Sequence, residues 1–551
     1  MGKTLNRRNL DFWFFAKIGI FLIFAIFLMY PFFSLFGRSF LSYEGEFTLD
    51  NFKTFFTYKY YYETLFRSLK VSASATIGAV IIGVPLAYIT SRYNIWGKRI
   101  VNVMIIMSLL SPPFIGAYSW ILLLGRNGTI TRFLDTLGIH FPSIYGFWGI
   151  ILVFTLKLYP YVYLYVSGAL DSIDSSLEEA AENLGMSKWK RMMTVTFPVI
   201  LPTIAAGAVM VFMSSLADFG TPMLIGEGYK VLPVLVYEEF MSEMGGNPGL
   251  ASALSIIVVC CSLSVLLYQK RVVAKKQYTM STLRPPKIEQ LKIIPRVLLT
   301  LGVFIVTSIT FLPQVVVVYT SFLKTNGPVF VKGFSLDSYQ TIFYKLGMNI
   351  RNTFTYSTVA IVLIIGLGII IAYLITKRRS KSSDILDILV MFPYVIPGAV
   401  LGIGLLLAFK KGPIVLAGTP YIMIIAYVIR KMPFTVRSSS AILQQVDQSV
   451  EEASINLGVS PMKSFFLITA RLMLPGIVSG AILSWISTIN ELSSSIMLYT
   501  GKTATISVAI YTEVVRASFG TAAALASILT LATLLSFVLF SIISKGKVSV
   551  V

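Results

Sequence analysis

Long uncharged runs of apolar residues recur along the chain, and their length predicts its fold. A helix of about 20 apolar residues crosses the hydrocarbon core of a bilayer. Ten uncharged runs approach or exceed that length, and each predicts a membrane-spanning helix. They cover residues 18–37, 71–91, 100–125, 192–217, 249–268, 297–323, 352–376, 388–409, 472–490 and 517–544.

Two further apolar segments are interrupted by charge. Residues 141–170 contain Lys157, and residues 412–436 contain Arg430 and Lys431. Counting both gives twelve predicted helices and an all-α membrane protein. A transmembrane barrel is excluded because the runs lack period-two alternation. The first run lacks a short apolar core followed by a small-residue cleavage site, so we interpret it as a retained helix and not as a signal peptide.

Composition supports the membrane assignment. Apolar residues make up 56% of the 551 residues and charged residues only 13%, which is too apolar for a soluble fold or for disorder. The adjacent Cys260 and Cys261 form no disulfide framework, and the single histidine, His140, leaves no histidine-based metal site. No metal site on this chain is expected.

The net charge of +21 would suggest nucleic acid on a soluble chain. Here the basic residues lie between apolar runs, where they orient a membrane protein, so no nucleic-acid partner is expected. Residues 269–293 form a basic linker, whereas residues 221–248 carry four glutamates against one lysine. The linker is therefore predicted to be cytoplasmic. Twelve spans then place both termini in the cytoplasm as well.

The chain contains an internal repeat. The segment SLEEAAENLG at residues 176–185 recurs as SVEEASINLG at residues 449–458, an offset of 273 (449 − 176). Each half has an even number of predicted spans, so the two six-helix repeats are predicted to be parallel. The predicted domains are residues 1–268, the linker 269–293, and residues 294–551. The same offset relates Pro160 to Pro433, Pro202 to Pro475, Lys157 to Arg430 and Asp218 to Glu491.

The repeated segment predicts a short helix, a sharp turn and a second helix on the cytoplasmic face. Ser176 with Glu179, and Ser449 with Glu452, fit the S-x-x-E capping box that begins a helix. Glycine follows in each copy, where a left-handed residue ends a helix. An ordinary loop between spans is the alternative. Two copies in register argue against it.

This segment resembles the EAA loop of the permease subunits of binding-protein-dependent ABC importers. The resemblance implies that each loop docks on a separate cytoplasmic ATPase, so two ATPase copies and an extracytoplasmic solute-binding protein are the expected partners. The usual I-x-L-P ending is close to residues 195–198, but Arg471 replaces its proline in the second copy. The implied ATPase-coupling residues are Glu179, Ala180, Ala181, Gly185, Glu452, Ala453, Ser454 and Gly458.

The fused form is most similar to ferric-iron import permeases of the bacterial inner membrane. Residues 217–222 and 490–494 are similar to that branch, although thiamine, polyamine and phosphonate importers share much of the pattern. Gly501-Lys-Thr503 is not a P-loop because Ile496 stands where its first glycine belongs. The chain is therefore not expected to be an enzyme, and ATP and magnesium are expected on the partner ATPase. An ion-gradient carrier remains an alternative, but it has no need of the duplicated loop.

Four charged residues occupy equivalent positions within or beside predicted spans: Lys157 and Arg430, Asp218 and Glu491. A charge in a bilayer usually faces the protein interior or a partner. Three interpretations stay open: they line the translocation path, acid and base pair within a half, or they lie at the membrane surface. The position of both carboxylates just after an uncharged span favours the path. Prolines at positions 112, 113, 393 and 397 predict broken helices beside it.

Overall fold

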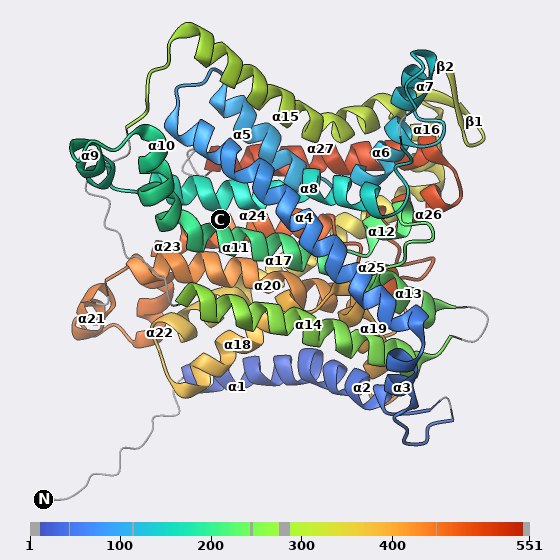
Figure 1. The fold of residues 1–551 in the computed structure, drawn as a ribbon. Helices are drawn as coiled ribbons and strands as arrows, with labels where there is room; N and C mark the ends of the chain where they lie inside the picture. The colour runs from blue at the N-terminus through green and yellow to red at the C-terminus, as the bar shows by residue number, and fades with distance from the viewer. Residues whose placement is uncertain are drawn as a thin grey trace, which may run out of the picture. The chain divides into compact units, whose positions relative to one another are not determined.

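The computed structural model describes residues 12–42, 44–112, 115–140, 142–242, 246–274, 287–447 and 449–543 (Figure 1). Within these residues, eight helices are long and apolar enough to cross a membrane, or up to ten if each of two bent helix pairs is one span. Each of the twelve predicted runs overlaps helix. The predicted span at residues 100–125 is divided into two helices, and the helix from Pro420 to Gln445 contains the charges of the second interrupted run.

The described residues form two compact units. The larger unit contains Arg38–Asn349 and Thr505–Leu535. Its elements are α3 (Asp50–Thr57), α4 (Lys59–Arg92), α5 (Lys98–Leu109), α6 (Ile115–Leu124), α7 (Thr129–Thr136), α8 (Phe147–Asp171), α9 (Ser175–Asn183), α10 (Lys188–Arg191), η2 (Met192–Thr196), α11 (Phe197–Ala217), α12 (Gly220–Ile225), α13 (Leu232–Met241), α14 (Pro248–Ala274), α15 (Ile293–Ser321), β1 (Leu323–Asn326), β2 (Val329–Phe334), α16 (Asp337–Thr341), η3 (Ile342–Leu346), α26 (Ile506–Val515) and most of α27 (Phe519–Ile543).

The smaller unit contains Ile350–Ala504 together with the first described helices and the end of α27. Its elements are α1 (Phe12–Phe24), η1 (Ala25–Met29), α2 (Tyr30–Ser39), α17 (Gly347–Thr376), α18 (Lys381–Val395), α19 (Gly398–Phe409), α20 (Pro420–Gln445), α21 (Ser449–Asn456), α22 (Pro461–Ser464), η4 (Phe465–Thr469), α23 (Ala470–Leu472), α24 (Leu474–Ile489) and α25 (Ser495–Leu498). The η elements are π-helical turns.

The fold departs from the all-α expectation at one hairpin. Strands β1 and β2 pair antiparallel, with Asn326 opposite Val329. Gly327, in the turn between them, has a positive φ of 58°, which glycine adopts readily. The strands are too short for the apolar-run pattern to reveal them.

The compact units do not coincide with the two sequence halves, because the halves exchange their first helices and the larger unit also contains α26 and most of α27. Trp13 in α1 is 2% exposed and packs with its ring centroid 4.4 Å from that of Tyr373 in α17. In the larger unit, α15 packs along α5 and α6. An apolar helix face needs only a complementary partner, and hydrophobicity along the chain does not say which half supplies it.

Each unit has a tightly packed junction at equivalent positions. A Cβ atom on Gly207 in α11 would lie 3.0 Å from the Cα atom of Val162 in α8. A Cβ atom on Gly480 in α24 would lie 2.5 Å from the Cα atom of Thr435 in α20. The two contacts occupy equivalent positions of the repeats, since the offset of 273 relates Gly207 to Gly480 and Val162 to Thr435. Small residues let membrane helices approach closely, so these glycines set the separation of the helices in each core.

The helix break that prolines predict within residues 388–409 is confirmed. Helices α18 and α19 meet at an angle of 108°. Pro393 lies inside α18, and Pro397 directly precedes α19. In the first half, α5 ends at Leu109 and α6 begins at Ile115. Pro113 lies outside the described residues. A proline removes a backbone donor and clashes with the preceding turn, which accounts for the interruption.

The α20–α24 junction yields a testable prediction. Replacing Gly480 by Ala should destabilise the protein by about 1–3 kcal/mol, because the new methyl group would overlap backbone atoms. Gly366→Ala in α17 is the matched control, since a Cβ atom there meets nothing within 4 Å. The thermal unfolding midpoint in detergent should fall for the first variant only. Equal unfolding midpoints for the two variants would show that the close approach of α20 and α24 at Gly480 does not limit packing.

Candidate functional site

An aspartate precedes the short helix of each repeated loop. The Asp174 carboxylate accepts a hydrogen bond from the Ser176 amide at 2.9 Å, and Asp447 accepts one from the Ser449 amide at 2.8 Å. This bond holds the pKa of Asp447 below its usual range. The predicted capping box was therefore wrong for α9, whose cap is Asp174. A carboxylate also interacts favourably with the positive end of the helix, which favours aspartate over serine at the cap.

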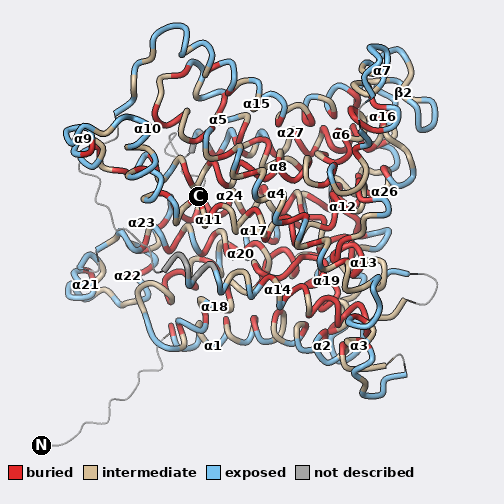
Figure 2. The backbone as a smooth tube through the Cα atoms, viewed as in Figure 1, coloured by how far each residue is buried: buried red, intermediate tan, exposed pale blue. Residues whose placement is uncertain are grey.

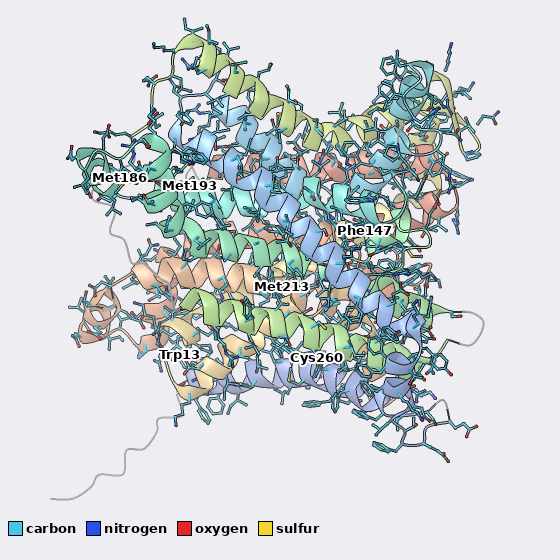
Figure 3. All side chains as sticks on the ribbon, in the orientation of Figure 1. Trp13, Phe147, Met186, Met193, Met213 and Cys260 are labelled. Atoms are coloured by element: carbon cyan, nitrogen blue, oxygen red, sulfur yellow. The ribbon has the colours of Figure 1, made fainter. Side chains whose placement is uncertain are left out.

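The predicted ends of both helices are confirmed. Gly185 has φ +78° and Gly458 has φ +88°. After α9, the Gly185 amide donates to the Glu182 carbonyl at 2.8 Å, and the Met186 amide donates to the Ala181 carbonyl at 3.1 Å. This pair of bonds is a Schellman motif, which turns the chain toward α10. Met186 is labelled at this turn in Figure 3.

Each loop presents an apolar side chain to solvent. Leu184 is 78% exposed, and its counterpart Leu457 is 86% exposed. In contrast, Ala181 and Ser454 are buried, so the second small residue of each motif packs beneath its helix and does not face outward. Figure 2 shows both short helices as mainly exposed. The loops thus carry a surface suited to a protein partner.

The glutamate preceding each motif glutamate anchors the loop, a role that the sequence pattern did not single out. Glu178 accepts hydrogen bonds from Arg92 at 2.8 Å and from Thr196 at 3.0 Å. In the second loop, Glu451 accepts one from Thr469 at 3.1 Å and another from Tyr373.

Both threonines lie in π-helical turns, η2 and η4, at the start of the following membrane helix. Such turns are frequent at functional sites. The equivalent offsets of glutamate and threonine could have revealed this anchor.

Within the larger unit, Lys157 lies 3.2 Å from the Asp218 carboxylate. Their side chains are 18% and 19% exposed. Asp218 also accepts a hydrogen bond from the Thr221 amide at 2.9 Å, where α12 begins. The acid therefore neutralises a base in α8 and fixes the turn that follows α11.

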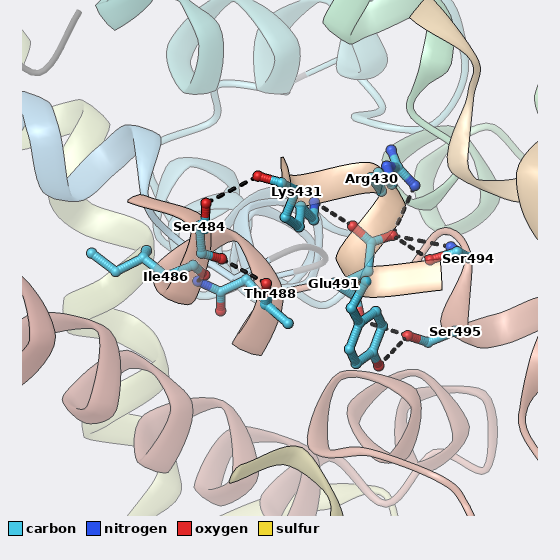
Figure 4. Close-up of polar contacts among 10 residues, drawn as sticks. Arg430, Lys431, Ser484, Ile486, Thr488, Glu491, Ser494 and Ser495 are labelled. Atoms are coloured by element: carbon cyan, nitrogen blue, oxygen red, sulfur yellow. Dashed lines mark hydrogen bonds and ion pairs between the residues drawn. The ribbon is translucent and has the colours of Figure 1, made fainter. Parts of the chain in front are cut away.

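The corresponding cluster in the smaller unit is more deeply buried and contains two bases (Figure 4). The Glu491 side chain is 4% exposed and lies 2.8 Å from Arg430, and it also contacts Lys431. It accepts a hydrogen bond from the Ser494 amide at 3.0 Å. A Cβ atom on Gly398, the first residue of α19, would lie 1.4 Å from an Arg430 nitrogen. Glycine is needed there to admit the guanidinium.

These contacts correspond to the interpretation in which acid and base pair within a half, which the sequence position had not favoured. Burial of Glu491 contradicts the interfacial interpretation for that residue. A role of the four charges in translocation stays a prediction. Lys431 was not among the candidate site residues, because its first-half counterpart is Leu158. Among the described residues, no group of three or more His, Cys, Asp or Glu side chains is placed to hold a metal ion.

Two segments of the chain match one protein family. Residues 79–278 and 364–548 each match the family described as "Binding-protein-dependent transport system inner membrane component". The chain belongs to this family and contains its domain twice. It is therefore the multi-pass inner-membrane permease component of such a transport system.

Two relatives span most of the chain. The ferric transport system permease protein FbpB of Actinobacillus pleuropneumoniae is 27% identical over 539 residues, which cover 95% of this chain and 77% of the relative. A putative ferric transport system permease protein, FbpB 1 of Haemophilus influenzae, is 27% identical over 501 residues, covering 88% and 77%. A bacterial ABC transporter that imports alginate is 21% identical with a TM-score of 0.41, covering 49% of this chain and 97% of its own.

The two ion-pair clusters should differ in their response to neutralisation. Glu491→Gln leaves two buried bases without an acid, and removing one partner of a buried pair costs about 3–5 kcal/mol. Asp218→Asn leaves a single base that retains some solvent contact, so its effect should be smaller. Membrane protein level and thermal midpoint measured together for both variants provide the comparison. A larger loss for Asp218→Asn would contradict the assigned burial.

Proposed function

We propose that the chain is the membrane-spanning permease subunit of an ATP-driven importer, with twelve spans in two parallel six-helix repeats. The bent pair α18–α19 would then form one span, and the helix from α22 to α23 would form another together with α24. The divided helix α5–α6 and the charged helix α20 would complete the set. The double family match supports the repeat. The basic linker supports cytoplasmic termini.

The observation that carries the proposal is the pair of exposed loops, each anchored by a glutamate to the start of a membrane helix. An exposed leucine on a short helix provides an apolar contact for another protein, and the anchor makes the helix move with the membrane domain. We infer that one copy of a cytoplasmic ATPase docks on each loop. ATP and magnesium would belong to that subunit, and this chain would need no cofactor.

Ferric iron is the substrate that we propose, delivered by an extracytoplasmic solute-binding protein. The proposal is supported by the two relatives named as ferric permeases, each matched over most of the chain. Thiamine, polyamine and phosphonate importers remain the alternatives within the class. The family assignment argues against the ion-gradient carrier.

The docking proposal predicts a selective effect of charge on the exposed leucines. The double variant Leu184→Asp with Leu457→Asp should insert normally and lose most ATPase retention, because a carboxylate replaces the apolar contact. Leu137→Asp is the matched control, since Leu137 is 59% exposed and directly follows α7, outside the repeated loops. ATPase co-purified with each affinity-tagged variant from membranes is the measurement. Equal retention by all three proteins would exclude the loops as the docking site.

Uptake by whole cells tests the proposed substrate. Cells that lack other ferric uptake should accumulate radiolabelled iron only when this chain, its binding protein and the ATPase are present together. The leucine variant should reduce uptake in parallel with ATPase retention. Uptake of thiamine, a polyamine or a phosphonate in place of iron would overturn the substrate and leave the importer class standing.

A further inference from the structure

The end of the linker forms a short strap against the first repeated loop. We define the strap as residues 287–290. The Glu289 amide donates to the Arg92 carbonyl at 2.9 Å, and the Asn94 amide donates to the Glu289 carbonyl at 3.2 Å. This is a parallel β-bridge between the linker and the end of α4. The Asn94 side chain also donates to Gln290 at 2.7 Å.

The strap contacts both short helices of the loop as well. Lys287 lies 2.7 Å from the Glu179 carboxylate in α9, and Lys188 in α10 donates to Glu289. Arg92 therefore accepts a hydrogen bond from the strap through its carbonyl and donates one to Glu178 through its side chain. One residue thus joins the linker, α4 and the first loop.

The second loop is held differently. Upstream of the loops the repeats align with an offset of 285 (372 − 87), since Ala87-Tyr88 recurs as Ala372-Tyr373. The counterpart of Arg92 is therefore Lys377, which donates to the Val446 carbonyl at 2.6 Å. Glu452, the counterpart of Glu179, is exposed. Within the part of the chain that the structure describes, no ion pair of Glu452 is present, and no strand pairs beside the second loop.

We propose that the strap positions the first coupling helix before any ATPase binds, so that the two loops are mechanically unequal. The inference rests on the proposed function, because it concerns the loops assigned to ATPase docking. The β-bridge fixes the strap to α4, and the two ion pairs hold α9 and α10 to the strap. Among the described residues, the second loop has no such strap and is held by the hydrogen bonds that Glu451 accepts and that Lys377 donates.

The exposure of the ion pairs defines what the strap can do. Lys287 is 78% exposed, and an exposed ion pair stabilises a fold only weakly. Such an ion pair breaks readily when a partner protein binds, so Lys287 does not prevent Glu179 from contacting that partner. The backbone hydrogen bonds between the strap and α4 remain in place when the ion pair breaks. The strap is therefore a positioning element and not a lock.

Hydrogen exchange in the purified permease without ATPase tests the inference directly. The double variant Lys287→Ala with Glu289→Ala should raise exchange about threefold to tenfold in peptides from residues 175–191. Peptides from residues 449–464 should be unchanged. The double variant Arg126→Ala with Glu227→Ala is the matched control, because it removes another exposed pair of the larger unit, 2.8 Å apart. Unchanged exchange at residues 175–191, or an equal rise in both loops, would overturn the strap.

A cross-link provides the reverse experiment. Asn94→Cys with Gln290→Cys, in a background with serine at positions 260 and 261, should form a disulfide. With Lys287 and Glu289 intact, this bond should slow exchange at residues 175–191 further, whereas in the strap variant, Lys287→Ala with Glu289→Ala, it should not, because the ion pairs to α9 and α10 are missing. A disulfide that forms without slowing exchange when both ion pairs are present would contradict the positioning role.

A second readout separates this inference from the proposed function. With the ATPase and binding protein added, the strap variant should retain ATPase and lose about half of the stimulated hydrolysis, since one loop of two is affected. Failure of the wild-type protein to retain any ATPase would refute the docking proposal, while the exchange result would still decide the strap. Full stimulation despite faster exchange would refute the predicted inequality.

Discussion

A carboxylate at the base of each repeated loop makes the interaction on which the coupling account depends. Glu178 and Glu451 each join a short exposed helix to a threonine in the π-helical turn that begins the next membrane helix. A hydrogen bond to a charged group contributes about 1.5–3 kcal/mol, more than an exposed ion pair. Without this bond, the docking helix could rotate about its flanking turns, and motion of a partner would not reach the membrane helices.

Charge within the membrane part imposes the second constraint. Each unit places a base on a long helix and an acid just after another, and the acid also accepts a hydrogen bond from a backbone amide three residues further on. The halves are nevertheless unequal, because Lys431 adds a second base to the more buried cluster. The strap adds a second difference, because it pairs with the end of α4 beside the first loop. A duplicated sequence has thus acquired two different halves.

Local pattern predicted much of this structure. The apolar runs overlap helices because lipid requires length and apolarity, which the sequence shows directly. The glycines at positions 185 and 458 were predicted from their place after a helical segment, and both have positive φ. The cap was misassigned because Ser176 and Glu179 fit a known motif, whereas Asp174 lies outside it.

Long-range packing could not be predicted in the same way. The exchange of α1 and α15 between the halves depends on complementary surfaces, and hydropathy does not report shape. The pairing of Glu491 with Lys431 was missed because the repeat offered no counterpart at Leu158. The strap is a single bridge in a polar linker, and no periodicity marks it. The break between α18 and α19 was the exception, because Pro393 and Pro397 are visible in the sequence and proline interrupts a helix directly.

The most direct test of the coupling account is the double variant Glu178→Gln with Glu451→Gln, studied with ATPase and binding protein in lipid vesicles. Glutamine keeps the shape of the anchor and removes its charge. The account predicts normal ATPase retention, with hydrolysis no longer stimulated by the loaded binding protein. Full stimulation in this variant would contradict the claim that these two carboxylates connect the docking loops to the membrane helices.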